Sequence, residues 1–413
     1  MTHTHADSFH GLGIAPKILE ILHRNDYHTP TPIQRQCIPV ANEGKDIVGI
    51  AQTGTGKTLA FGIPVIQSLI REEGEALVVV PTRELAIQVD EVLQLLGKSL
   101  GIQTAVLIGG EPIERQIKLL RMSPQILIVT PGRLIDHLQR KTVHLSARIL
   151  VLDEADRMLD MGFYPQIKII LEKLQQNRQT MLFSATMPQE ILKLATRYMQ
   201  LPVRVEVAPP GTTASDVSQE MFFVESRDKI GLLEKLLYEY NGSVLIFTKT
   251  KFGAKKLVRD IKRNGHRAVD LHSDRSLAQR RDAMEGFKLG KYRILVATDI
   301  AARGIDVSGI ELVLNYDLPA SAEDYVHRIG RTARAGAVGH AISFAMPHQK
   351  GDVKDIERFI RMAVRISPVP PLGRPRQSEG DRRPPQPGAQ SRRPARRERT
   401  HAGWKPDRSR SRS

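Results

Sequence analysis

A glycine-rich turn followed by a lysine and a threonine is the first feature of this sequence that could perform chemistry. Backbone N–H groups of such a turn, and of a helix that begins there, bind phosphate groups. Lys57 would reach the β- and γ-phosphates of a nucleotide, and the hydroxyl of Thr58 would bind Mg²⁺. The alternative is a chance glycine-rich turn. The turn follows the apolar residues 47–50 and precedes a helix-like segment, and it reads Ala51-Gln52-Thr53-Gly54-Thr55-Gly56-Lys57-Thr58, with alanine where the usual pattern has glycine.

A second feature is a group of carboxylates that follows another apolar run. Residues 149–152 have the pattern of a buried strand and lead directly into Asp153-Glu154-Ala155-Asp156. A phosphate-binding loop needs acidic partners of this kind for nucleotide hydrolysis. Asp153 would bind Mg²⁺ from the second side, and Glu154 would orient and deprotonate the attacking water. The alternative is a solvated acidic turn, but ligands of open α/β sheets bind at these strand ends.

Apolar runs along the chain predict the elements that must position these residues. Strands alternate with helix-like segments over residues 1–208 and again over 219–366, which is typical of parallel, doubly wound α/β sheets. The strands expected in the first region are 47–50, 77–80, 104–108, 126–129, 149–152, 181–183 and 203–207. Those in the second are 221–224, 244–247, 268–271, 294–297, 312–315 and 340–344. We predict two α/β domains with a nucleotide in the cleft between them, since only the first has a phosphate-binding loop.

Two segments lack this periodicity. Residues 209–218 begin with Pro209-Pro210-Gly211 and are predicted to be a linker. Residues 367–413 are rich in proline and arginine and poor in apolar residues, so we predict a disordered basic tail. From Pro371 to Ser413, twelve Arg and one Lys against four acidic residues supply +9 of the net charge of +16. We expect the tail to bind nucleic acid; the alternative is a tail that only improves solubility.

The composition of the chain indicates which kind of partner it binds and in which cellular compartment it works. A net charge of +16 and a pI near 10.0 favour a polyanion, and nucleic acid before membrane. The single cysteine, Cys37, excludes an intramolecular disulfide framework and fits a reducing compartment. No apolar run is as long as a transmembrane helix, and the N-terminus lacks the pattern of a signal peptide. We expect a cytoplasmic protein with no membrane partner.

Taken together, these motifs resemble the DEAD-box RNA helicases of superfamily 2, whose name spells out residues 153–156. The match covers about residues 9–345 in the order and spacing of the family, and the bacterial RhlE-like group is the subgroup that we predict. The resemblance implies two tandem RecA-like domains that use ATP and Mg²⁺. It also implies an RNA partner that is contacted through its backbone with little sequence specificity.

The resemblance extends to an adenine-recognition motif. The run from Tyr27 to Gln34 looks like the family's Q motif. Gln34 carries both a donor and an acceptor, so it can pair with the N6 and N7 edge of adenine. Phe9 lies at the family's upstream distance and would stack on the base. The alternative for Phe9 is an ordinary apolar contact.

Several loops of the first region match motifs that grip the RNA backbone in this family. Arg side chains, Thr hydroxyls and exposed Gly amides are phosphate donors that read no base. Helix capping by Thr82 and turn formation by the glycines are the alternatives for any single loop. The residues concerned are Pro81, Thr82, Arg83, Gly110, Thr130 and Arg133.

A further motif of the first region is Ser184-Ala185-Thr186. It matches the family motif that, with Asp156, couples ATP hydrolysis to strand separation. The alternative is that these hydroxyls only cap a helix.

The second region carries the remaining family motifs. Thr298 would contact RNA phosphate, and Asp306 would accept hydrogen bonds from the ribose of ATP. Arg331 and Arg334 match arginine fingers, which stabilise the transition state of phosphoryl transfer. His327 and Arg328 would bridge to the acidic motif of the first domain. The weakest match is the run from His272 to Arg280, where Ser273 and Leu277 replace the family's Gly and Gln, although Arg280 remains as a predicted RNA contact.

These predictions lead to an expected function. The chain would be an ATP-dependent RNA helicase that locally unwinds duplexes or remodels RNA–protein complexes, through RNA-gated closure of two domains and ATP hydrolysis. Ribosomal precursors and an RNA-degradation assembly are candidate partners. One alternative is a nucleotide-gated RNA clamp without productive turnover. Another is a DNA-directed translocase, because only contacts to the 2′-hydroxyl distinguish RNA from DNA.

Overall fold

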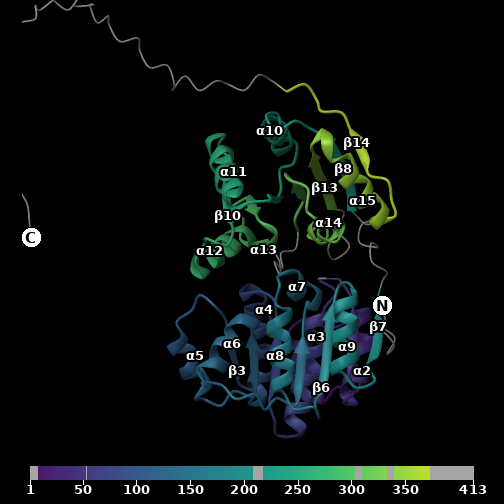
Figure 1. The fold of residues 1–413 in the computed structure, drawn as a ribbon, viewed down its shortest axis with the longest axis vertical. Helices are drawn as coiled ribbons and strands as arrows, with labels where there is room; N and C mark the ends of the chain where they lie inside the picture. The colour runs from purple at the N-terminus through teal and green to yellow at the C-terminus, as the bar shows by residue number, and fades with distance from the viewer. Residues whose placement is uncertain (1–7, 53, 208–216, 303–308, 333–338, 373–413) are drawn as a thin grey trace, which may run out of the picture. The chain divides into compact units, whose positions relative to one another are not determined.

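The chain forms two α/β lobes in a computed structural model, which describes residues 8–52, 54–207, 217–302, 309–332 and 339–372 (Figure 1). Lobe 1 comprises residues 8–207 and lobe 2 comprises residues 217–372. Each lobe has one sheet of seven strands, and every strand pair in both sheets is parallel. This confirms the predicted fold class of two doubly wound domains.

The sheet of lobe 1 has the strand order β3-β4-β2-β5-β6-β1-β7. All four residues of β1, β2, β4 and β5 are buried, which explains why these strands read as continuous apolar runs. The strands are β1 (Ile47–Ile50), β2 (Ala76–Val79), β3 (Thr104–Leu107), β4 (Ile126–Val129), β5 (Ile149–Leu152), β6 (Gln179–Ser184) and β7 (Val203–Glu206). Each was predicted from the sequence to within two residues at either end.

Two hydrophobic clusters cover the two faces of this sheet. Along β2, Val78 belongs to one cluster, whereas Leu77 and Val79 belong to the other, as the alternation of side chains in a strand requires. Helices α1–α4 contribute to the first cluster and α6–α9 to the second. The helices are α1 (Pro16–Arg24), α2 (Pro32–Asn42), α3 (Lys57–Arg71), α4 (Arg83–Gly97), the 3₁₀ turn η2 (Lys98–Leu100), α5 (Ile113–Leu120), α6 (Pro131–Gln139), α7 (Ala155–Asp160), α8 (Tyr164–Lys173) and α9 (Gln189–Tyr198).

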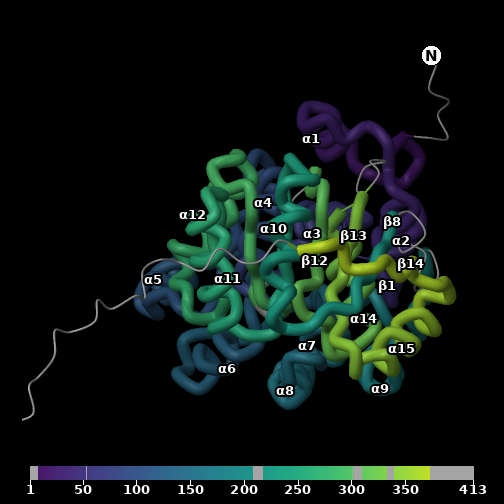
Figure 2. The backbone as a smooth tube through the Cα atoms, turned by 90° about the horizontal axis from the view of Figure 1, so that it is seen from above, coloured from purple at the N-terminus to yellow at the C-terminus, as the bar shows by residue number. Residues whose placement is uncertain are grey.

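The sheet of lobe 2 has the corresponding order β10-β11-β9-β12-β13-β8-β14, and Figure 2 shows β12, β13, β8 and β14 next to one another. Its strands are β8 (Val217–Phe223), β9 (Val244–Phe247), β10 (Ala268–Leu271), β11 (Ile294–Ala297), β12 (Leu312–Asn315), β13 (Gly339–Ala345) and β14 (Arg365–Ser367). Its helices are α10 (Lys229–Glu239), α11 (Lys251–Arg263), α12 (Leu277–Lys288), α13 (Asp299–Ala302), α14 (Ala322–Ile329), the 3₁₀ turn η4 (Pro347–Gln349) and α15 (Lys350–Ile360).

Both ends of lobe 2 extend beyond the boundaries expected from the sequence. Strand β8 already begins at Val217, inside the segment 209–218 that was predicted to be a linker. Strand β14 pairs in parallel with β8, with Ile366 opposite Met221, and Val369 and Leu372 pack against the core beside α10. Residues 367–372 of the predicted tail therefore belong to lobe 2, and residues 373–413 lie outside the described residues. Three residues, two of them exposed, are too short a strand for a hydrophobic pattern to reveal.

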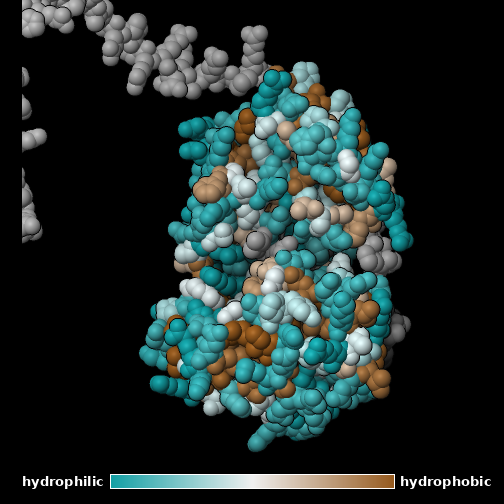
Figure 3. Space-filling model, viewed as in Figure 1, coloured by the Kyte–Doolittle hydropathy of each residue, from teal (hydrophilic) through white to brown (hydrophobic). Residues whose placement is uncertain are grey.

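One face of the described chain is predominantly polar. Hydrophilic side chains dominate the face shown in Figure 3, and hydrophobic side chains reach that surface in separate patches. No helix in the described ranges has the length and apolar character needed to cross a bilayer.

Candidate functional site

The strand order of lobe 1 brings three chemically equipped loops together. Strands β5, β6 and β1 are neighbours, with Leu152 opposite Leu182 and Ile50 opposite Ser184. Because the strands are parallel, the loops that follow them emerge at the same edge of the sheet. The amide of Ala51 donates to the carbonyl of Ser184 at 2.9 Å, which joins the first and third loops directly. The glycine-rich turn, the acidic run and the Ser184 loop thus form one site.

The glycine-rich turn needs glycine at two of its positions. Gly54 and Gly56 have φ angles of 86° and 87°, in the left-handed region that favours glycine. Gly56 is also the N-cap of α3, and a β-carbon there would collide with the side-chain amide of Gln34. The hydroxyl of Thr55 donates to the carbonyl of Gln52 at 2.7 Å, which braces the turn. Thr53, a predicted ATP contact, lies outside the described residues.

Lys57 is the first residue of α3, and its side chain is buried. Its ammonium group donates to the carbonyl of Ala51 at 2.9 Å, so the side chain folds back over the turn that it follows. The positive charge also acts on Asp153, whose pKa it lowers against the larger effect of burial. The structure therefore places this cation between the glycine-rich turn and the acidic run.

Asp153 is a buried carboxylate with little to stabilise its charge. Burial raises its pKa to about 6, although Lys57 and the amide of Glu154, which donates to Asp153 Oδ1 at 2.9 Å, both favour the ionised form. No cluster of three or more His, Cys, Asp or Glu side chains that could hold a metal occurs within the described part of the chain. Mg²⁺ is usually bound by one or two protein oxygens together with substrate phosphates and water. Asp153 and the half-buried Thr58, in the first turn of α3, fit that mode of binding.

Glu154 is held in an unusual conformation with unused hydrogen-bonding capacity. Its φ angle of 51° is left-handed, which costs a non-glycine residue roughly 1–3 kcal/mol and is common at functional sites. The carboxylate is buried, and Arg157 Nε approaches its Oε2 to 3.7 Å. Neither carboxylate oxygen has a hydrogen-bond partner among the described residues. A fixed acceptor of this kind is suited to orienting a water molecule.

Asp156 connects the acidic run to the loop after β6. Its Oδ2 accepts three hydrogen bonds, from the amides of Ala185 at 3.1 Å and Thr186 at 2.9 Å and from the Thr186 hydroxyl at 2.9 Å. The hydroxyl of Ser184 accepts from the amide of Asp156 at 3.3 Å. The structure thus brings together three residues that were predicted to couple the two halves of the reaction. A change in the position of either loop must break or move these bonds.

The two predicted adenine contacts are already engaged within lobe 1. Gln34 Oε1 accepts from the amide of Thr31 at 2.9 Å, and its Nε2 donates to the carbonyl of Gly56 at 2.9 Å. Gln34 therefore links the start of α2 to the glycine-rich turn, a role that the sequence did not indicate. Phe9 is buried in the hydrophobic core of lobe 1, in agreement with the alternative of an ordinary apolar contact.

The predicted RNA-binding loops lie beside this site at the same sheet edge, after strands β3, β4 and β2. Arg83 lies across the Gly109-Gly110 turn so closely that a β-carbon on Gly110 would collide with its guanidinium. Arg133 Nη2 donates to the carbonyl of Glu111 at 3.0 Å. One hollow of the surface has Pro81, Thr82, Arg83, Gly109, Thr130 and Arg133 among its lining residues. Thr82 also caps α4 by accepting from the amide of Leu85 at 3.2 Å, so the capping alternative applies to it.

Arg328 of lobe 2 is anchored inside its own lobe. Its Nε and Nη2 donate to the two carboxylate oxygens of Asp299 at 2.5 and 2.8 Å, and its Nη1 donates to Asn315 Oδ1 at 3.0 Å and to the carbonyl of Asp317 at 2.7 Å. The guanidinium also stacks over Phe247, 5.0 Å from the ring centre. The contacts of Arg328 therefore hold α14 to the ends of β9, β11 and β12, and its bridge to the acidic run stays a prediction. Asp299 and Asn315 were not recognised as its partners, because these residues are scattered along the sequence.

The other predicted residues of lobe 2 are partly described. Thr298 directly follows β11 and is half-buried, and its amide donates to the carbonyl of Leu271 at 3.2 Å. His327 is half-buried in the last turn of α14, and Arg331 is buried just beyond that helix. Asp306 and Arg334 lie outside the described residues.

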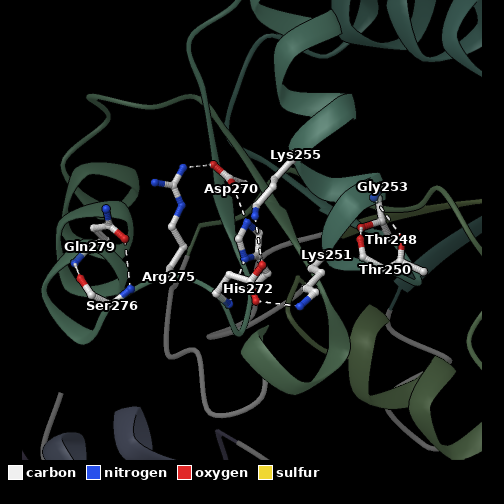
Figure 4. Close-up of polar contacts among 11 residues, drawn as sticks. Thr248, Thr250, Lys251, Gly253, Lys255, Asp270, His272, Arg275, Ser276 and Gln279 are labelled. Atoms are coloured by element: carbon white, nitrogen blue, oxygen red, sulfur yellow. Dashed lines mark hydrogen bonds and ion pairs between the residues drawn. The ribbon is translucent and has the colours of Figure 1, made fainter. Parts of the chain in front are cut away.

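The segment that matches the family least well has its own polar network (Figure 4). His272 is fully buried, and its Nε2 is hydrogen bonded to Asp270 Oδ2 at 2.6 Å. Arg275 pairs with the other oxygen of Asp270. Ser276 and Gln279 form a capping box at the start of α12, so the departures at Ser273 and Leu277 leave this helix start intact. Arg280, one turn further on, is buried and approaches the carbonyl of Ala301 to 3.4 Å.

Comparisons with known proteins agree with this arrangement. Residues 31–194 match the model of the DEAD/DEAH box helicase family, and residues 228–336 match that of the helicase conserved C-terminal domain. The chain is 43% identical over 369 residues to the ATP-dependent RNA helicase CshA of Limosilactobacillus reuteri, covering 88% of this chain and 73% of that protein. It is 41% identical to the DEAD-box ATP-dependent RNA helicase CshA of Geobacillus kaustophilus, covering 88% of this chain and 79% of that protein. Since both relatives carry the name CshA, the RhlE-like subgroup stays a prediction.

The fold of this chain is also similar to solved structures of proteins bound to RNA. The structure of Saccharomyces cerevisiae Dbp5 bound to RNA and ADP BeF3 is similar with a TM-score of 0.78 and 29% identity, covering 88% of this chain and 96% of that one. The structure of Mss116 bound to ssRNA and UDP-BeF is similar with a TM-score of 0.80 and 29% identity, covering 87% of this chain and 79% of that one.

Proposed function

The chain belongs to the DEAD-box family of ATP-dependent RNA helicases, and on this premise we propose how its own residues bind ATP, bind RNA and couple the two. The turn from Ala51 to Gly56, with Lys57, binds the phosphates. Asp153 and Thr58 hold Mg²⁺, which neutralises charge on the phosphates when it is bound. Glu154 orients the attacking water and accepts its proton. The observation that carries this proposal is the buried Glu154 carboxylate next to Asp153, whose two oxygens accept no hydrogen bond from the described residues and have only Arg157 near them, at 3.7 Å.

RNA binding is proposed for the loops around Arg83, Gly110 and Arg133 in lobe 1 and for Thr298 in lobe 2. These groups contact phosphate and sugar, so binding is largely independent of sequence. ATP and RNA together draw the two lobes into a closed state, in which Arg331 and Arg334 reach the γ-phosphate. Closure separates the strands of a short duplex locally, and hydrolysis reopens the protein. Ribosomal precursors and degradation substrates suit such a sequence-independent enzyme.

The experiment that tests this function is ATP hydrolysis measured without nucleic acid, with single-stranded RNA and with DNA of the same sequence. We expect strong stimulation by RNA and little by DNA. Equal stimulation by DNA would favour a DNA-directed translocase. ATP binding without hydrolysis under all three conditions would favour a nucleotide-gated clamp. A duplex-unwinding assay on the RNA that stimulates hydrolysis then tests the helicase step.

Removing residues 373–413 should weaken RNA binding more than ATP hydrolysis at saturating RNA. The truncated chain should end at Leu372, because residues 367–372 pack on lobe 2. The removed segment carries twelve Arg and one Lys against four acidic residues. For single-stranded RNA the slope of log K against log salt decreases by about 0.7 for each phosphate that the protein no longer neutralises. Binding titrations at several salt concentrations measure this slope, and an equal slope for both chains would exclude a contribution of the tail.

Thr186→Val should uncouple strand separation from ATP hydrolysis. The substitution keeps the size of the side chain but removes the hydroxyl that donates to Asp156 Oδ2 at 2.9 Å. A hydrogen bond to a charged group contributes about 1.5–3 kcal/mol, so we expect duplexes unwound per ATP hydrolysed to fall about tenfold or more. Thr196→Val is a matched control, because among the described residues the Thr196 hydroxyl bonds only to the carbonyl of Leu192, within α9. Equal coupling in both variants would leave the Ser184 loop with a structural role alone.

A further inference from the structure

Helix α11 of lobe 2 presents an exposed basic face that the proposed function does not use. The helix contains six basic residues and one acidic residue, Asp260. Its buried side consists of Ala254, Leu257, Val258 and Ile261. Phe252, Lys255, Arg259 and Lys262 are exposed and recur at intervals of three or four residues, which places them on one side of the helix. They span eleven residues, and the ten steps from the first to the last correspond to about 15 Å at the rise of an α-helix.

An exposed aromatic ring stands at one end of this face. The side chain of Phe252 is 70% exposed. Lys251 Nζ lies 5.4 Å and Lys255 Nζ lies 6.0 Å from the centre of its ring. An aromatic ring beside cations combines the two groups that bind single-stranded nucleic acid: one stacks on a base and the others pair with phosphates. Burial in the core does not explain this ring, since most of its surface faces solvent.

A groove of about 490 Å³ runs beside the same face. It is lined by Lys255, Val258, Arg259, Lys262 and Arg263 of α11 and by Asp270 and Arg275. Of these residues, Lys255, Asp270 and Arg275 are labelled in Figure 4. Asp270 does not leave an open negative charge there, because His272 and Arg275 occupy its two carboxylate oxygens. In the described part of the chain, Arg259 and Lys262 form no ion pair. The groove is therefore positively charged, with at least two cations open to a ligand.

Asp274 restrains two of the lysines of this face. Its carboxylate oxygens accept from Lys251 Nζ at 2.8 Å and from Lys255 Nζ at 3.0 Å. Both lysines are labelled in Figure 4. These hydrogen bonds lower the pKa of Asp274 to about 2, so it stays ionised at neutral pH. An RNA phosphate must compete with this carboxylate for the lysines.

The excess of charge on α11 is specific to that helix. Helix α15 of the same lobe is similar in length and also largely exposed. Its three basic residues are balanced in number by three acidic residues, Asp352, Asp355 and Glu357. Exposed helices of lobe 2 are thus not basic in general. An unbalanced cationic face next to an exposed ring is chemically complementary to a polyanionic ligand with flat groups.

We propose that Phe252, Lys255, Arg259 and Lys262 form a second RNA-binding surface, which takes single-stranded RNA outside the contacts assigned to Thr298 and to the loops of lobe 1. The proposal rests on RNA being the substrate of this enzyme. A base stacks on Phe252, and the following phosphates lie along α11 and the groove. The surface would hold an RNA strand to lobe 2 independently of the ATP site.

The test compares two triple variants of the full chain by fluorescence anisotropy with a labelled single-stranded RNA of about 25 nucleotides, over a series of salt concentrations. Lys255→Gln/Arg259→Gln/Lys262→Gln should bind about tenfold more weakly at low salt, and its salt slope should decrease by about 2, because three phosphates are no longer neutralised. Lys350→Gln/Lys354→Gln/Arg358→Gln removes the same charge from α15 of the same lobe and should bind like the unsubstituted protein. Indistinguishable binding by the two variants would overturn the proposal.

Three single substitutions at two positions give readouts that misfolding would not produce. Phe252→Leu should weaken binding about 5- to 100-fold, whereas Phe252→Tyr, which keeps a ring, should not. Asp274→Asn should strengthen binding and steepen the salt slope by up to about 1.4, because it releases two lysines. Weaker binding by Asp274→Asn would contradict the restraint described above.

The outcome also separates this inference from the proposed function. If the unsubstituted protein neither binds RNA nor hydrolyses ATP in response to it, the proposed function fails. If it does both and the α11 variant binds RNA normally, only the second surface fails. Loss of binding to an acidic polypeptide such as polyglutamate, with unchanged RNA binding, would assign the face to a protein partner and overturn the proposal.

Discussion

Lys57→Ala is expected to abolish productive ATP binding and to reduce the rate of RNA-stimulated hydrolysis at least about 100-fold. Removal of one preorganised hydrogen-bond donor that stabilises charge in a transition state has an effect of this size. Lys57 is the buried cation at the start of α3, between the glycine-rich turn and Asp153. Alanine favours the helix as well as lysine does, so the backbone of α3 should persist. The carbonyl of Ala51 loses the hydrogen bond from Lys57, which lowers the free energy of unfolding by about 1–3 kcal/mol.

Binding of a fluorescent ATP analogue and phosphate release at saturating RNA are the two measurements for this variant. Lys45→Ala is a suitable control, because Lys45 lies just before β1 but is exposed and pairs only with Glu43 in the described structure. Thermal unfolding of both variants shows whether the fold is retained. Hydrolysis by a folded Lys57→Ala variant at the unsubstituted rate would refute the assignment of residues 51–58 as the phosphate-binding loop.

In contrast to Lys57→Ala, Glu154→Gln should keep the binding of ATP and RNA but lose ATP hydrolysis. Glutamine has nearly the same shape, and the left-handed backbone at this position is no less favourable for it. It cannot accept a proton from water, however, and a positioned general base contributes about 10²–10⁴-fold to a rate. We expect ATP and RNA to bind normally, phosphate release to slow by that factor, and the ternary complex to persist.

Single-turnover phosphate release and the dissociation rate of labelled RNA in the presence of ATP test this variant. Glu190→Gln, an exposed change in the first turn of α9, is the matched control for the loss of one carboxylate. Slow release together with slow RNA dissociation is the combination that we expect. Rapid phosphate release by Glu154→Gln would remove Glu154 from the reaction and leave it as a partner of Arg157.

The prediction of a DEAD-box RNA helicase is confirmed by the family to which the chain belongs, whereas the roles of individual residues stay proposals. The family motifs were readable because they are short and contiguous. Residues 51–58 and 153–156 each sit at the end of a buried strand, and a buried strand of a parallel sheet is a continuous apolar run. Such local patterns also predicted every strand except β14.

Side-chain partners were the part that the sequence could not reveal. Gln34 was predicted to bind adenine, but its side chain forms a hydrogen bond with Gly56. Arg328 was predicted to contact the acidic run, but it forms hydrogen bonds with Asp299 and Asn315. In each pair the residues lie more than ten positions apart. Their contact depends on which elements become neighbours, and no local periodicity encodes that order.

By itself, the sequence determined the identity and order of the chemical groups: a phosphate loop, an acidic run, RNA-gripping loops and an arginine element on two α/β lobes. Only the tertiary structure decided which of them meet. Strand β6 enters the sheet between β5 and β1, although β1 lies more than a hundred residues before it, so the Ser184 loop comes between the acidic run and the glycine-rich turn. The strand order follows from packing helices over both faces of the sheet, which is a property of the whole lobe. For the same reason the basic face of α11 became visible only when its apolar side was seen buried against the sheet of lobe 2.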